Sequence, residues 1–185
     1  MAVHGRVPCH VGSSLAGEDV PLSSVKVRPL QSDDDLEQAG ELVVRAYLAI
    51  PRYPKDPEYH QVIADVRGRL HEVTVIGAFE NEQLVGCLTF VVDHQGPHAE
   101  HGDEDATSFR YFGVDPDSTA RGVGRAMVQW VIDESRRLGK KRISIHTIPV
   151  MHTAMRMYES LGFVRRPDLD QVWDPVVGWA YVKTL

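Results

Sequence analysis

Hydrophobic and polar positions follow two periods along the chain, one typical of helices and one typical of strands. Apolar residues at helical spacing predict a helix over residues 32–50, whose serine and three aspartates suit the positive end of a helix, and a second helix over 57–72. The same spacing predicts a third helix that ends at Gly139 and a short fourth helix over 151–162. Short apolar or alternating runs predict seven strands, at residues 25–30, 73–80, 83–93, 106–114, 141–148, 163–166 and 176–185.

The order of these elements indicates the fold class. The two-residue connection Asn81-Glu82 predicts a hairpin, and hence antiparallel strands. The helix between strands 106–114 and 141–148 predicts a crossover, and hence a parallel pair. We therefore expect an α/β fold with a mixed, mostly antiparallel central sheet of six to seven strands and helices on both faces.

Composition and charge narrow the class of protein. The chain has 185 residues, 43% of them hydrophobic and 25% charged, which fits one globular domain. We expect residues 1–24, rich in glycine, serine and proline, to form a flexible tail, and residues 25–185 to form the domain. A net charge of −6 argues against broad binding to nucleic acid or to an anionic membrane.

Three absences in the sequence point to the cytoplasm. No apolar run is long enough to span a membrane, and the N-terminus lacks the apolar stretch of a signal peptide. The two cysteines, Cys9 and Cys87, form no zinc or disulfide pattern, which fits a reducing compartment. We expect a cytoplasmic protein, as a monomer or a homodimer.

Two glycines and two arginines stand where the third helix begins, in Arg121-Gly122-Val123-Gly124-Arg125-Ala126. A glycine inside a helix costs about 1 kcal/mol relative to alanine. A helix start binds anions because its first N–H groups lack partners, and glycine allows close approach. An ordinary tight turn is the alternative interpretation. The nucleotide P-loop and the Rossmann fingerprint are not matched.

Two motifs here resemble those of a known family. Val114-x-Pro116 followed by Arg121-x-x-Gly124-x-Ala126 resembles the first signature of the GNAT superfamily of acetyl-CoA-dependent N-acyltransferases. Downstream, Ala154-x-x-Met157-Tyr158-x-x-x-Gly162-Phe163 resembles the second signature. The order of predicted elements over residues 25–185 also fits that fold.

The resemblance implies where acetyl-CoA lies. Backbone N–H groups of the turn would hold the coenzyme A pyrophosphate, with charge-assisted contacts from two arginines; the turn residues are Arg121, Gly122, Val123, Gly124, Arg125 and Ala126. The pantetheine arm would pair with the preceding strand near Phe112, Gly113 and Val114. Gly113 stands where a bulge or a close ligand approach would be easy. The two parallel strands would splay apart there and leave a gap for the thioester.

The resemblance also implies how the chemistry proceeds. A backbone N–H of the 112–114 strand, Val114 above all, would stabilise the oxyanion. Tyr158 stands at the family's tyrosine position and is the candidate acid for the departing thiolate, besides a coenzyme contact. The family's usual asparagine before the second motif is Met151 here, so its coenzyme contact would differ.

The general base is the open point of the sequence. Many GNAT enzymes carry a glutamate on the strand before the turn, and residues 106–114 hold none. His146 is one substitute, because a neutral imidazole accepts a proton at neutral pH. A structural histidine and a water relay are the other two interpretations. Alternation places His146 with Ser144 on one side of its strand, which is either the acceptor face or the coenzyme face.

Several polar and aromatic segments are candidates for the acceptor side. The loop 94–105 gathers histidines and acids, for which a solvated loop, a metal site and a negatively charged wall of the acceptor cleft are three interpretations; we expect no metal. Arg52 and Tyr53 follow the first helix, in a region that shapes the acceptor site in the family. Trp173 and Trp179 belong to a C-terminal segment that forms either a wall of that site or ordinary packing.

The sequence as a whole predicts an N-acetyltransferase that moves an acetyl group from acetyl-CoA to a primary amine of a small molecule or peptide. An acyl-CoA-binding sensor without turnover is the alternative, motivated by the missing strand glutamate. A phosphate-binding domain of another kind would rest on the turn alone.

Overall fold

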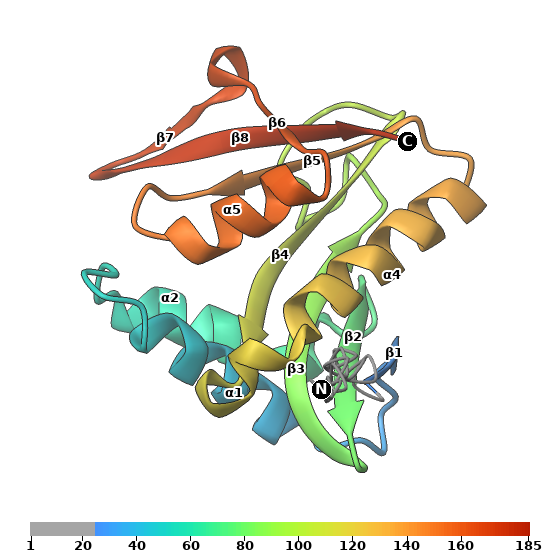
Figure 1. Ribbon diagram of the computed structural model, residues 1–185, viewed down its shortest axis with the longest axis vertical. Helices are drawn as coiled ribbons and strands as arrows, with labels where there is room; N and C mark the ends of the chain where they lie inside the picture. The colour runs from blue at the N-terminus through green and yellow to red at the C-terminus, as the bar shows by residue number, and fades with distance from the viewer. Residues whose placement is uncertain (1–24) are drawn as a thin grey trace, which may run out of the picture.

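The computed structural model describes residues 25–185, without the side chains of residues 119–121. The predicted tail, residues 1–24, lies outside the described residues. Within the described part, eight strands form a sheet with the order β1-β2-β3-β4-β5-β8-β6, and β7 pairs with β8 (Figure 1). The strands are β1 (Lys26–Pro29), β2 (Thr74–Glu80), β3 (Gln83–Val91), β4 (Ala106–Val114), β5 (Arg142–Thr147), β6 (Val164–Arg165), β7 (Gln171–Trp173) and β8 (Val176–Thr184).

The helices cover the sheet on both sides. They are α1 (Leu36–Leu48), α2 (Pro57–Ala64), α3 (Val66–Arg69), α4 (Val123–Arg137) and α5 (His152–Ser160), with two short 3₁₀ helices, η1 (Pro116–Arg121) and η2 (Pro167–Leu169). None of these described helices is long and apolar enough to cross a membrane. The mixed, mostly antiparallel sheet with helices on both faces, expected from the sequence, is confirmed.

Two local details differ from the sequence prediction. The single helix expected over 57–72 is two helices, because Asp65 ends α2 and caps α3, where its carboxylate accepts the Gly68 N–H. The short strand β7 was not predicted as a separate element. Its three residues pair with β8 as a hairpin. A run of three residues is too short to show the alternation of apolar and polar positions that predicts a strand.

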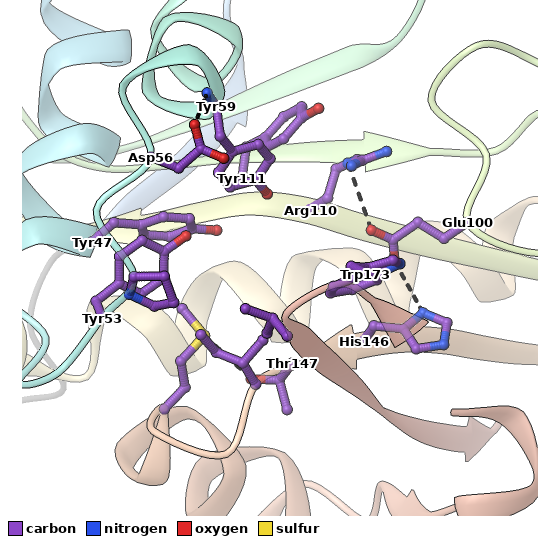
Figure 2. Close-up of a pocket in the computed structure, with 14 residues that line it drawn as sticks. Tyr47, Tyr53, Asp56, Tyr59, Glu100, Arg110, Tyr111, His146, Thr147 and Trp173 are labelled. Carbon is purple, nitrogen blue, oxygen red and sulfur yellow. Dashed lines mark hydrogen bonds and ion pairs between the residues drawn. The ribbon is translucent and has the colours of Figure 1, made fainter. Parts of the chain in front are cut away.

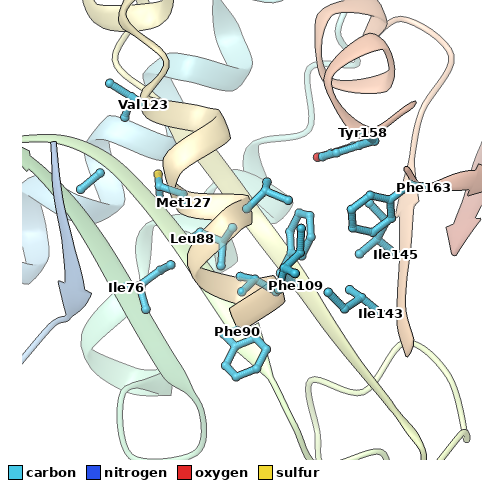
Figure 3. Packing of buried hydrophobic residues seen from close by; sticks show 14 of the residues in the cluster. Ile76, Leu88, Phe90, Phe109, Val123, Met127, Ile143, Ile145, Tyr158 and Phe163 are labelled. Atoms are coloured by element: carbon cyan, nitrogen blue, oxygen red, sulfur yellow. The ribbon is translucent and has the colours of Figure 1, made fainter. Parts of the chain in front are cut away.

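Two hydrophobic clusters lie on opposite faces of the sheet. One joins α4 and α5 to the sheet, and Figure 3 shows Met127 of α4 above Leu88 and Phe109, with Tyr158 and Phe163 beyond. The other cluster joins helices α1, α2 and α3 to the opposite face of the sheet, through side chains such as Leu36, Ile63 and Cys87. The sheet therefore separates a face covered by α4 and α5 from a face covered by α1, α2 and α3.

The parallel strands β4 and β5 separate soon after they meet. Their pairing is confined to Ala106 with Arg142 and Thr107 with Ile143, at the start of each strand. In Figure 1, β4 descends steeply while β5 runs across the top of the view beside β8. The splayed parallel pair predicted from the sequence is present, and its open end lies between Val114 and Thr147.

A bulge in β4 controls which side chains face the open end. Cys87 of β3 pairs with Gly113 and Thr89 pairs with Arg110, so one β3 residue lies opposite both Tyr111 and Phe112. Tyr111 has φ of 48°. Two guanidinium groups lie against its ring, those of Arg69 and Arg110 at 4.8 and 4.5 Å from the ring centroid. As a result, Arg110 and Tyr111 line the same pocket although they are consecutive.

Packing against helix α1 explains why residue 113 is a glycine. A Cβ there would lie 2.8 Å from the Cα of Val43, so glycine lets helix α1 approach β4. Of the two interpretations of Gly113, the bulge lies just before it, at Tyr111 and Phe112, and packing against α1 accounts for glycine here. A close approach of the ligand at Gly113 stays a prediction.

Candidate active site

The turn before α4 has the backbone conformation of a helix start. Gly122 caps the helix with φ of 77°, a conformation that other residues rarely adopt, and a Cβ there would meet no atom within 4 Å. The N–H of Ala126 donates to the Gly122 carbonyl. The N–H groups of Val123, Gly124 and Arg125 precede this first bond of the helix. The turn thus has the open, positive end that a pyrophosphate needs.

Gly124 and Arg125 are also in contact with neighbouring elements. A Cβ on Gly124 would lie 3.3 Å from the Phe112 ring and 3.4 Å from the sulfur of Met157, so this glycine brings α4 close to β4 and α5. The Arg125 guanidinium donates to the hydroxyl of Ser160 at 2.6 Å. The side chain of Arg121, the other predicted phosphate contact, lies outside the described residues.

The backbone of β4 directs N–H groups into the open end of the parallel pair. The Asp115 N–H donates to the Val85 carbonyl of β3 at 2.9 Å, and N–H groups alternate along a strand, so the Val114 N–H faces the other way. The Phe112 N–H also points away from β3 and donates to the Tyr47 hydroxyl at 3.3 Å. Of these two N–H groups near the predicted thioester position, that of Phe112 is taken up by Tyr47, and that of Val114 points into the open end.

Tyr158 is a residue of α5, and its side chain belongs to the hydrophobic cluster between α4, α5 and the sheet. Its side chain is 5% exposed, and its ring contacts those of Phe109 and Phe163 at centroid distances of 5.8 and 5.7 Å. Burial, and to a smaller extent the Glu100 carboxylate, raises the pKa of the Tyr158 hydroxyl. The hydroxyl therefore carries its proton at neutral pH and is a donor.

A pocket of about 310 Å³ opens on the opposite face, at the splayed ends of β4 and β5. Figure 2 shows it between α1 and α2 on one side and the β7–β8 hairpin on the other. Aromatic side chains form most of its wall, with two carboxylates and an arginine. The lining residues are Tyr47, Tyr53, Pro54, Asp56, Tyr59, Glu100, Arg110, Tyr111, His146, Thr147, Ile148, Met151, Trp173 and Val176.

His146 lies on the pocket side, which answers the question left open by the alternation of its strand. Its side chain is 2% exposed, its Nε2 donates to the Leu169 carbonyl at 3.0 Å, and its Nδ1 lies 3.5 Å from Glu100. Burial lowers the pKa of the imidazole, but the hydrogen bonds to Glu100 and Leu169 and the nearby carboxylates raise it by more, above its ordinary value. Both ring nitrogens are therefore occupied by protein groups.

Glu100 is the pocket residue that the sequence did not single out. It belongs to the loop between β3 and β4, and its side chain is 9% exposed between His146 and Arg110 (Figure 2). The Gln171 side chain donates to the Glu100 carbonyl at 2.7 Å and fixes the backbone. Nothing in the sequence distinguishes Glu100 from the other acids of its loop, because its position depends on contacts with residues 10 to 71 positions away.

The other acids of this loop face away from the pocket. Asp103 pairs with Arg142, and Asp105 pairs with Lys141 at 2.8 Å, both at the start of β5. Within the described residues, no three His, Cys, Asp or Glu side chains gather as a metal site. The interpretation of a negative wall thus applies to Glu100, while Asp103 and Asp105 fasten the loop to the sheet.

The C-terminal hairpin supplies the remaining wall. The Trp173 ring lies on β8, because a Cβ on Gly178 would be 2.6 Å from it, and its centroid is 5.6 Å from the His146 ring. Met151 lines the same pocket, and the Thr147 hydroxyl donates to its sulfur at 3.3 Å. Tyr53 is a wall residue as well, whereas Arg52 and Trp179 are not among those that line the pocket.

Comparison with known proteins places this geometry in a family. The profile of the acetyltransferase (GNAT) family matches residues 38–163. The mycothiol acetyltransferase of Geodermatophilus obscurus is 30% identical over 96 residues, which are 52% of this chain and 30% of that relative, so the chain spans less than a third of its length.

Solved structures share the fold at low sequence identity. The PaiA N-acetyltransferase of Thermoplasma acidophilum, in complex with coenzyme A, superposes with a TM-score of 0.66 at 12% identity, over 88% of this chain and 99% of that one. A putative acetyltransferase of Salmonella typhimurium, YncA, with its cofactor acetyl-CoA, has a TM-score of 0.62 at 20% identity, over 88% and 95% of the two chains.

The family and enzyme class expected from the two sequence motifs are confirmed by these matches. The first motif ends at the α4 turn and the second lies on α5, and the family profile includes both. The chain belongs to the acetyltransferase (GNAT) family.

Proposed function

We propose that this protein transfers the acetyl group of acetyl-CoA to the primary amine of a small molecule, by direct attack of the amine on the thioester. The observation that carries the proposal is the pocket at the splayed ends of β4 and β5, on the face opposite the α4 turn. A volume of about 310 Å³ suits a small ligand, at the lower end of the usual range.

Coenzyme A would bind along the α4 face. The N–H groups of Val123, Gly124 and Arg125 would hold the pyrophosphate, and the pantetheine arm would lie in the gap beside β4. The acetyl carbonyl would then reach the N–H group of Val114. This is a fixed backbone donor, which stabilises an oxyanion without reorganisation.

Acetyl transfer would pass through the gap between the two faces. The acceptor nitrogen attacks the acetyl carbon from the pocket, the C–N bond forms, and the C–S bond breaks as the tetrahedral intermediate collapses. The Tyr158 hydroxyl, which is protonated at neutral pH, donates its proton to the departing thiolate and is reprotonated from solvent, while the nitrogen releases the proton that amide formation displaces. The products are the N-acetylated amine and free coenzyme A.

A screen of amines with detection of released thiol tests this proposal. We expect thiol release, and a product heavier by one acetyl group, with small primary amines, and weaker release with lysine side chains or N-termini of folded proteins. Binding of acetyl-CoA without thiol release from any amine would favour the acyl-CoA sensor instead. Faster turnover with peptides would move the acceptor class away from small molecules.

A further inference from the structure

The pocket contains two carboxylates, and they differ in the contacts that they already make within the protein. The Asp56 carboxylate caps helix α2, where it accepts the Tyr59 N–H at 3.0 Å, and the residue is exposed. Glu100 caps no helix, is largely buried, and faces the pocket next to β4. Strand β4 itself carries no acid. A carboxylate near the thioester therefore comes from the preceding loop.

Glu100 is held in place by three elements of the sheet. Gln171 of β7 fixes its backbone carbonyl, Arg110 of β4 lies 3.6 Å from one carboxylate oxygen, and His146 of β5 lies 3.5 Å from the other. These two distances are longer than the 2.7–2.9 Å typical of tight charge-assisted hydrogen bonds. Each oxygen thus lies near a nitrogen of Arg110 or His146 and retains capacity to accept a proton.

His146 is less suited to accept the proton itself. Its Nε2 proton is donated to the Leu169 carbonyl, so Nδ1 is the nitrogen that faces Glu100. With 2% of its side chain exposed, the imidazole presents no free nitrogen to the pocket. Its geometry is that of a group that orients a neighbouring carboxylate.

We propose that Glu100 is the catalytic base of the acetyl transfer, with His146 and Arg110 as positioning residues. The proposal rests on the proposed function above. The acceptor enters as an ammonium ion, which the Glu100 carboxylate attracts. One proton passes from the ammonium nitrogen to Glu100, directly or through water, and then to solvent. The neutral amine attacks the acetyl carbon and forms the C–N bond, and the nitrogen gives up its second proton to solvent by the same route. The C–S bond breaks, and the thiolate leaves and is protonated by Tyr158, which is reprotonated from solvent.

The test compares Glu100→Gln with wild type, using an alkylamine identified by the screen. At about pH 7, kcat/KM is expected to fall by about 10² to 10⁴, the usual range for acid–base catalysis. The loss should shrink as the pH approaches the pKa of an alkylamine, about 10.4, because the amine then arrives already neutral. For the same reason it should be smaller for a weakly basic amine. Acetyl-CoA affinity, measured by calorimetry, should not change.

Two further variants separate positioning and structural effects. Glu104→Gln, the same change on the same loop at an exposed position, should behave as wild type. His146→Gln should lower kcat/KM by about tenfold, with the same decline of the loss at high pH, because Glu100 remains but is less well oriented.

Three results would overturn the assignment of Glu100. They are wild-type kcat/KM in Glu100→Gln, a loss that is equal at every pH, and an equal loss in Glu104→Gln. If Glu100→Gln also loses acetyl-CoA affinity, Glu100→Ala with added formate decides: recovery of activity supports the base, and no recovery overturns it. Failure of the proposed function is recognised separately, since wild type itself would then release no thiol with any amine.

Discussion

The α4 turn and the proposed acceptor pocket lie on opposite faces of one sheet, but they are built in different ways. The turn is a contiguous run of six residues, 121–126, that follows a strand and opens a helix. The pocket draws on α1, the segment before α2, α2 itself, the loop before β4, and then β4, β5 and the C-terminal hairpin. A ligand that binds backbone N–H groups needs only a local conformation, whereas one that binds side chains needs a completed fold.

Because the two regions are built differently, we expect them to respond differently to substitution. The coenzyme side is made of backbone groups and two glycines, and so is tolerant of side-chain change at many positions. The acceptor side depends on a few aromatic and charged side chains that hold one another, such as Glu100 with His146 and Trp173 with Gly178. We expect substitutions on the first side to affect coenzyme binding or the thiolate, and substitutions on the second to affect the acceptor amine.

The largest effect is expected at Tyr158. Tyr158→Phe keeps the ring and its contacts with Phe109 and Phe163, and removes the hydroxyl proposed as the acid. We expect kcat to fall by about 10² to 10⁴, with acetyl-CoA affinity unchanged. Tyr181→Phe is the matched control, since this neighbouring ring lies 6.4 Å away and its hydroxyl donates to Glu159. Wild-type kcat in Tyr158→Phe would remove the acid assignment.

A smaller effect on coenzyme binding is expected at Gly122. Gly122→Glu places a side chain and a negative charge at the proposed pyrophosphate site, so acetyl-CoA affinity should fall at least tenfold, about 1.4 kcal/mol. Gly139→Glu is the control at the other end of α4, where φ is 71° and a Cβ would also meet no atom within 4 Å. Both variants bear similar backbone strain, so equal affinities measured by calorimetry would contradict the pyrophosphate assignment.

On the acceptor side, a substitution at a residue that does not line the pocket should alter binding of the amine. Gly178→Ala places a Cβ 2.6 Å from the Trp173 ring, which must then move away from its place in the pocket wall. We expect KM for the amine to rise about fivefold, near 1 kcal/mol, with acetyl-CoA affinity unchanged. Gly102→Ala, which meets no atom within 4 Å, is the control. An unchanged KM in steady-state kinetics would mean that Trp173 does not contact the acceptor.

The smallest effect is expected in the pH dependence of stability at His146. Because the folded protein raises the pKa of this imidazole, the stabilisation is fully present below the unfolded value of about 6.5 and is lost as pH rises through the folded value. His146→Gln should therefore lower the free energy of unfolding more at about pH 6 than at about pH 9. Urea denaturation at both values tests this, and an equal difference at both would count against a charged pair with Glu100.

The sequence predicted the coenzyme side closely because its signals are local. The turn at Gly122, the helix that ends at Gly139 and the splayed pair of β4 and β5 agree with the structure. Gly113 is the exception on this side, because glycine is needed there for the close approach of Val43, which belongs to a helix about 70 residues earlier. Roles for Tyr158 and for the turn residues remain predictions.

The acceptor side was largely hidden from the sequence. Periodicity limited His146 to one side of β5, but which face that side meets depends on where α2 and the β7–β8 hairpin pack. The loop 94–105 showed a group of acids with no difference among them. In the structure Asp103 and Asp105 pair with Arg142 and Lys141 at the start of β5, and Glu100 alone among these three enters the pocket.

By itself, then, the sequence determined most of the elements, their order, the family and the glycine turn that opens α4, because each follows from residues close together in the chain. Only the tertiary structure decided that Glu100, Arg110 and His146 meet, that the bulge falls at Tyr111, and that Trp173 closes the wall. Those contacts depend on how strands and a hairpin far apart in sequence are brought together, and the burial of two hydrophobic clusters, one on each face of the sheet, fixes that arrangement.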